Sequence, residues 1–192
     1  MLAQIVLFIL DTVCGFLTLA LLVRFAMQWM RVPFRNPLGQ FIVAVTDWMV
    51  RPLRRLIPSL FGLDTASLLL AWLWQAVYQG IALGLSGMLL AVSPAPTLVV
   101  ALLAALEVAK ISVYLVIGAV LVSAVFSWVN PHAPLAGVFN TLTNPLLRPF
   151  RRVIPPIGGV DLSPLALLLL LQIVLFVIAG LRNGVMPMLL HG

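Results

Sequence analysis

Long apolar runs dominate this chain, and most of its charged side chains gather in the stretches between them. Four such runs cover residues 2–30, 66–91, 97–129 and 164–190. Each is longer than the roughly 20 residues that a helix needs to cross a hydrocarbon core of about 30 Å. The runs lack the strict alternation of apolar and polar residues that predicts strands. The pattern therefore predicts four membrane-spanning helices.

The composition also indicates an integral membrane protein. Of 192 residues, 63% are hydrophobic and 8% are charged, against roughly 25% charged residues in a soluble domain. The single cysteine, Cys14, excludes an intrachain disulfide and a cysteine-rich metal site. The first apolar run lacks the basic start and the cleavage site of a signal peptide, so we interpret it as a retained span.

Basic residues are concentrated in the stretches that follow the first and third runs. Residues 31–64 contain five arginines, and residues 130–163 contain three. Four spans place both stretches on one side, which the positive-inside rule assigns to the cytoplasm. We therefore expect a multi-pass protein of the bacterial inner membrane, with both termini and the turn at 92–96 outside. The net charge of +6 suits anionic lipid, and we expect no direct contact with nucleic acid.

One unit occurs twice, at a constant offset of 97 residues. The motif RPLRRLIP at 51–58 returns as RPFRRVIP at 148–155. We expect the copies to occupy residues 1–92 and 97–192, each with two spans joined by a short cytoplasmic amphipathic helical segment. Because each copy has an even number of spans, both insert the same way up, related by a pseudo-twofold axis along the membrane normal. The predicted fold is an all-α membrane protein with two tandem repeats of parallel topology.

Three arginines of each motif recur at i, i+3 and i+4, which places them on one face of a helix. Apolar residues lie between them, so we expect the helix to lie in the plane of the membrane surface. The sequence leaves two roles open: these arginines only fix topology, or they also bind anionic lipid or a partner protein. The candidate lipid- or partner-binding residues are Arg51, Arg54, Arg55, Arg148, Arg151 and Arg152.

Prolines are expected to delimit these helices. Helix starts are predicted at residues 36–37 and 133–134, because proline is tolerated at the first helical position. A second start is predicted at Asp47 and at Asn144, both of which are N-cap residue types. Proline inside the motif predicts a short or kinked helix, and proline at its end terminates the helix. The structural residues of the motif are Pro52, Pro58, Pro149, Pro155 and Gly159.

Two further pairs of polar residues align at the same offset. Asp64 and Asp161 precede the second and fourth spans, where each either caps the span or pairs with an arginine of its own motif. Gln75 and Gln172 lie about 16 Å into those spans, near the middle of the bilayer. These amides either bond across the pseudo-twofold axis or line a path for a solute.

The remaining charges within the spans do not indicate a reactive site. Asp11 and Glu107 each lie about 30 Å from the basic end of their span, which predicts a position near the outer surface. Glu107 and Lys110 can pair at i, i+3. The two histidines have no neighbours at ligand spacing, and motifs of metalloproteases, phosphate-binding loops and serine hydrolases are missing. We therefore expect no enzyme, no metal and no cofactor.

The doubled motif, followed in each copy by a Gly-x-Asp step and an apolar helix, resembles the YggT family over nearly the whole chain. These are small bacterial integral membrane proteins with relatives in cyanobacteria and chloroplasts. The resemblance implies links to osmotic tolerance, cell division and nucleoid distribution, and in chloroplasts to biogenesis of a cytochrome complex. The second copy keeps the fuller turn, at 155–159, and is the expected site if that turn is functional.

Together these features favour a non-catalytic scaffold or assembly factor that binds membrane lipids. Membrane, cell-division or assembly proteins are the other expected partners, and self-association is a further option. The alternative is a small transporter or channel component in osmotic or ion homeostasis.

Overall fold

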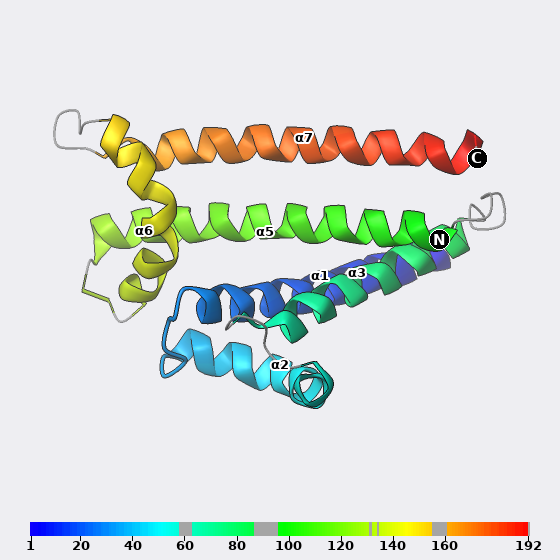
Figure 1. Cartoon of the computed structure of the whole chain (residues 1–192), viewed down its shortest axis with the longest axis horizontal. Coiled ribbons are helices and arrows are strands. Elements are labelled where there is room, and N and C mark those ends of the chain that lie inside the picture. Colours follow the sequence, from blue (N-terminus) through cyan, green and yellow to red (C-terminus); the bar gives the residue numbers. More distant parts are fainter. Residues whose placement is uncertain (58–62, 87–95, 131, 134, 155–160, 192) are drawn as a thin grey trace.

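The fold was analysed in a computed structural model of the whole chain (Figure 1). The structure describes residues 1–57, 63–86, 96–130, 132–133, 135–154 and 161–191. Six helices occupy these residues: α1 (Leu2–Trp29), α2 (Pro37–Leu56), α3 (Thr65–Leu85), α5 (Pro96–Val129), α6 (Ala136–Val153) and α7 (Ser163–His191).

Four helices of the described part, α1, α3, α5 and α7, are long and apolar enough to cross a membrane. This confirms the predicted number of spans and the all-α class. Successive spans run in opposite directions, so both termini lie at one end of the bundle (Figure 1). Helix α6 lies across the other end, and α2 lies beside α1 in the same half of the molecule.

Three of the four spans contact one another, and the fourth packs mainly on one of these three. Helix α1 packs along α3, α5 contacts both of them, and α7 packs mainly on α5 and α6. In each copy the short helix with the arginine motif packs on both spans of that copy. The two copies therefore share one local architecture, and α7 lies at the edge of the molecule.

The two motif helices bury equivalent positions. Val50 of α2 and Leu147 of α6 are 97 residues apart, and both side chains are almost fully buried, as are Thr46 and Thr143. Val50 packs in a cluster with Leu21 of α1. This shared register shows that each motif helix presents the same face to its spans.

The predicted helix starts are partly wrong. Helix α2 begins as expected, with the Asn36 side chain accepting a hydrogen bond of 2.8 Å from the Gly39 amide. Helix α6 begins at Ala136, after the predicted 133–134, and has no side-chain cap, since alanine at 133 offers no capping oxygen.

The second starts predicted at Asp47 and Asn144 do not exist, because α2 and α6 continue through these positions. They also continue through Pro52, Pro145 and Pro149. Of the two predicted forms, a short or a kinked helix, the short one is therefore wrong. All three prolines are exposed. Water can therefore satisfy the carbonyls that lose their helical N–H partner, which lowers the cost of an internal proline.

Candidate functional site at the two arginine motifs

The first copy contains a buried ion network centred on Arg24 of α1. Its side chain is 7% exposed, and its Nη2 lies 2.8 Å from Asp47 of α2. Nη1 donates a hydrogen bond of 2.8 Å to the Thr46 hydroxyl, and Nε lies 3.5 Å from Asp64. Arg24 therefore joins α1 to the motif helix and to the start of α3.

Asp64 combines the two roles that the sequence left open. It caps α3 by accepting from the amide and hydroxyl of Ser67, and it pairs with Arg54 through both carboxylate oxygens. Arg54 also donates to the Gln28 side chain at 2.7 Å. Burial of the Asp64 carboxylate raises its pKa, but the hydrogen bonds from Arg54 and Ser67 and the charge of Arg54 outweigh burial, so the pKa lies below its usual value.

These contacts fix the first motif by compensating its charges internally. A buried charge is tolerated only when it is paired and hydrogen-bonded. Asp47 accepts from Arg24 and also from Arg51, whose Nη2 lies 2.7 Å away at i, i+4. Even the largely exposed Arg51 is therefore held by a carboxylate of its own copy.

The second copy keeps only the outer part of this arrangement. Asp161 accepts from Arg151 at 2.8 Å and from the Ser163 amide at 2.9 Å, so the same pairing and capping recur. Arg151 also donates to the side-chain oxygen of Asn144 at 3.0 Å. Burial raises the pKa of Asp161, but the hydrogen bonds from Ser163 and Arg151 and the charge of Arg151 outweigh it, leaving the pKa below its usual value.

Two substitutions between the copies remove the buried part. At the offset of 97, Leu121 stands where the first copy has Arg24, and Asn144 stands where it has Asp47. The Arg151–Asp161 pair is consequently open to solvent, with side chains 46% and 40% exposed. In the first copy, Asp64 is 1% exposed.

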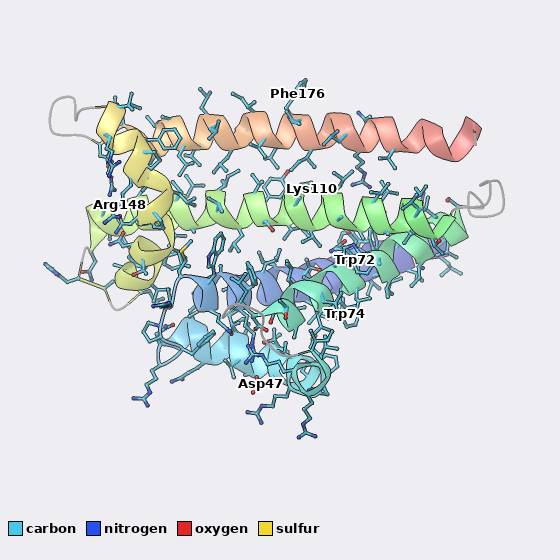
Figure 2. All side chains as sticks on the ribbon, in the orientation of Figure 1. Asp47, Trp72, Trp74, Lys110, Arg148 and Phe176 are labelled. Carbon is cyan, nitrogen blue, oxygen red and sulfur yellow. The ribbon has the colours of Figure 1, made fainter. Side chains whose placement is uncertain are left out.

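A hollow of about 460 Å³ lies beside Arg148 on α6. Figure 2 labels Arg148, at the end of the molecule where α6 lies. Its described lining also includes Thr141, Asn144, Pro145 and Arg151. The equivalent of Arg148 is Arg51, which pairs with Asp47. Among the described residues, Arg148 has no such ion-pair partner, and the residue is exposed.

The other predicted motif residues divide into two groups. Arg55 and Arg152 are exposed at the ends of α2 and α6, and Pro52 and Pro149 are exposed inside these helices. Three predicted positions and the two turns that contain them lie outside the described residues: Pro58, Pro155 and Gly159.

The two matched glutamines lie in different environments, and they do not bond to each other across an axis. Gln75 is buried and donates a hydrogen bond of 3.0 Å to the Thr18 hydroxyl of α1. Gln172 is exposed on α7 and has no hydrogen-bond partner among the described residues. Leu115 occupies the position equivalent to Thr18, so the second copy offers no hydroxyl there.

A second polar cluster lies in the other half of the spans. Glu107 of α5 pairs with Lys110, as predicted, and also accepts from Arg182 of α7 at 2.8 Å. Asp11 of α1 interacts with the Tyr78 hydroxyl of α3, near the charges of Glu107 and Arg182. Glu107 is roughly 33 Å along α5 from the end that carries α6. All four spans thus contribute a polar group to this region.

The sequence interpretation missed three of these contributors. The sequence pattern assigns no specific contact to Arg24, Arg182 or Ser67. The specific role of Arg24 can be inferred by comparing the copies. A charged residue in one copy that is replaced by leucine in the other indicates an interaction that only the first copy makes. Arg182 carries no comparable signal, since only the fold brings it to Glu107.

Comparison with known proteins gives a consistent result. The sequence model of a family described as CCB3/YggT matches residues 3–85 and 102–182, one segment in each copy. "Uncharacterized protein YggT" of Escherichia coli K12 is 38% identical over 187 residues, 96% of this chain and 95% of its own. "Uncharacterized protein PA0392" of Pseudomonas aeruginosa is 38% identical over 174 residues, 87% and 84% of the two chains. No solved structure matches the chain.

Proposed function

The chain belongs to the CCB3/YggT family, and from this premise we propose that it is a non-catalytic scaffold of the bacterial inner membrane. Its two arginine helices hold anionic phospholipid at the cytoplasmic surface and thereby anchor and orient the protein for partner proteins. The observation that supports this proposal most directly is that α2 and α6 each expose a face of arginines at equivalent positions.

The location of the arginines supports lipid as their ligand. Each motif helix packs on two apolar spans, so its exposed face lies beside the ends of membrane helices. Basic residues at that level attract anionic headgroups, each contributing about 1 kcal/mol. Topology alone needs positive charge in the loop. It does not need arginines fixed by aspartates, as Arg54 is by Asp64 and Arg151 by Asp161.

Lipid retention tests the proposal. The purified full-length protein should retain phosphatidylglycerol in preference to phosphatidylcholine when released from mixed nanodiscs and weighed by native mass spectrometry. Replacing four exposed motif arginines, Arg51, Arg55, Arg148 and Arg152, by glutamine should abolish this preference. Arg35→Gln removes an exposed charge outside the motifs and serves as the control. A wild-type protein without preference would overturn the proposal.

The orientation can be tested at two equivalent exposed positions. Gln40 of α2 and Gly137 of α6 are 97 residues apart, and both are exposed. A side chain at Gly137 meets no atom within 4 Å. In a Cys14→Ala background, Gln40→Cys and Gly137→Cys should both be protected from an impermeant thiol reagent in whole cells and labelled after lysis. Labelling of either one in whole cells would contradict the cytoplasmic assignment.

A small transporter or channel component is the second candidate, and one observation favours it. The polar cluster of Asp11, Tyr78, Glu107 and Arg182 takes one member from each span, and ionisable groups within spans often mark ion or proton routes. Proteoliposomes that contain only this protein should then pass ions, and Glu107→Gln should reduce the flux. Vesicles as tight as protein-free ones would exclude this function.

A further inference from the structure

We propose that the hollow beside Arg148 binds the phosphate of an anionic phospholipid headgroup, and that Asn144 creates the site by leaving Arg148 without a carboxylate. This inference rests on the proposed function and assigns its specific lipid contact to the second copy. The proposed function attributes lipid binding to both arginine faces, whereas this inference concerns the one site beside Arg148.

The two copies differ at the residue that lies four positions before the first arginine of the motif. In α2, Asp47 lies four residues before Arg51 and pairs with it at 2.7 Å. In α6, Asn144 lies four residues before Arg148, where a neutral amide cannot form an ion pair. The same spacing on the same helical face thus gives a neutralised arginine in one copy and an available one in the other.

Total charge does not explain the difference. The first motif with its network contains four arginines (Arg24 among them) and two aspartates, Asp47 and Asp64, and the second contains three arginines and Asp161. Both sets carry a net charge of two positive units. A diffuse attraction to anionic lipid would treat these sets alike, so selectivity for the second copy must come from local pairing.

The hydrogen-bond donors around the hollow suit a phosphate. Arg148 makes no hydrogen bond or ion pair with any described residue, and Arg151 uses Nε for Asp161 and Nη1 for Asn144, so that Nη2 has no partner in the same set. The Asn144 oxygen accepts from Arg151, and its amide NH₂ group, which has no acceptor in the described part of the chain, can donate to a ligand. No carboxylate occurs in the described lining. Arginine pairs with phosphate through two parallel hydrogen bonds, which adds geometric specificity.

The surroundings favour a lipid over free phosphate. Val153, near the end of α6, is 80% exposed, and Leu165, at the start of α7, is 63% exposed. Val153 follows Arg151 by two residues on α6, and Leu165 follows Asp161 by four residues on α7. These two helices pack together. A ligand with a phosphate and acyl chains can use both the arginine and the apolar surface.

The test changes the pairing of Arg148 without removing any arginine. Asn144→Asp restores the carboxylate of the first copy, and it should weaken phosphatidylglycerol binding to the purified full-length protein about tenfold, as should Arg148→Gln. Asn144→Ala leaves Arg148 unpaired but removes the amide that lines the hollow, so its loss of binding should be smaller than that of Asn144→Asp. Arg152→Gln removes the same charge as Arg148→Gln from outside the hollow, and its loss should also stay below about threefold.

Each other outcome is informative. Equal losses for Asn144→Asp, Arg148→Gln and Arg152→Gln would mean diffuse attraction, overturning the site while the proposed function stands. No loss in any of them, with wild-type preference for phosphatidylglycerol intact, would place the lipid elsewhere. Inorganic phosphate that binds as tightly as phosphatidylglycerol would overturn the lipid assignment. Unchanged thermal unfolding of Asn144→Asp and Asn144→Ala would show that both variants are folded.

Discussion

Arg24 is a buried charge that is stabilised by contacts with three side chains of other helices and their ends. Removing a buried arginine that contacts Asp47, Thr46 and Asp64 takes one partner away from each of these groups. Arg24→Leu should lower the free energy of unfolding by about 3 kcal/mol, the cost typical of breaking a buried pair. The double variant Arg24→Leu, Asp47→Asn recreates the second copy's combination and should be less destabilised than Arg24→Leu alone. Unfolding in mixed micelles measures both, and equal losses would contradict the pairing.

Asp64 should make stability depend on pH. Its folded pKa lies below the ordinary value of 3.8 because hydrogen bonds from Arg54 and Ser67, with the charge of Arg54, outweigh burial. Its contribution is therefore complete above the unfolded pKa and is lost as the pH falls through the folded pKa. The unfolding temperature should fall below about pH 4 in the wild type, and less steeply in Asp64→Asn. Parallel curves would exclude Asp64 as the source.

The two glutamines form a matched pair for mutation. Gln75→Leu removes the donor to the Thr18 hydroxyl and should cost about 1 kcal/mol, the scale of hydrogen bonds between membrane helices. Gln172→Leu removes an exposed side chain without a partner in the described chain and should change stability by less than about 0.5 kcal/mol. Unfolding of both purified variants by sodium dodecyl sulfate checks the order, and the reverse order would be inconsistent with the packing.

At the scale of elements, apolar length alone predicted the four spans, because crossing a bilayer sets a minimum length for any helix. The motif helices were harder. Proline and capping signals suggested breaks at Asp47 and Asn144, yet α2 and α6 continue, since packing of Val50 and Leu147 on the spans outweighs local preference. The candidate site was found in part: the Asp64–Arg54 pairing follows from sequence proximity, whereas Arg24 reaches the same carboxylate only through the fold.

The contact between α5 and α7 depends on Glu107. Glu107→Gln leaves both Arg182 and Lys110 without their carboxylate, whereas Lys110→Gln leaves the cross-helix pair intact. The first variant should lower the unfolding midpoint by roughly 2–4 °C more than the second, the shift expected for about 1 kcal/mol. Differential scanning fluorimetry of both proteins in detergent measures it. A larger effect from Lys110→Gln would show that Arg182 does not depend on Glu107.

At the scale of the whole molecule, one architecture occurs twice with different internal rigidity. The buried network of Arg24 and Asp64 fixes α2, and the exposed pair of Arg151 and Asp161 leaves α6 less constrained. Backbone amides near the end of α6 should therefore exchange with deuterium faster than those near the end of α2, by about tenfold or more. Mass spectrometry of the protein in nanodiscs can compare the two. Slower exchange in α6 would mean that burial of the network does not govern local opening.

The ion network of the first copy has a consequence for how the chain is made. Ribosomes deliver Arg24 before either of its carboxylate partners, so α1 enters the bilayer with a cation that nothing yet neutralises. Asp47 is synthesised as part of α2, and Asp64 is synthesised later, directly before the first residue of α3. Biosynthesis of this half therefore passes a defined point, the emergence of Asp47, before which a prematurely released fragment carries Arg24 without a carboxylate partner.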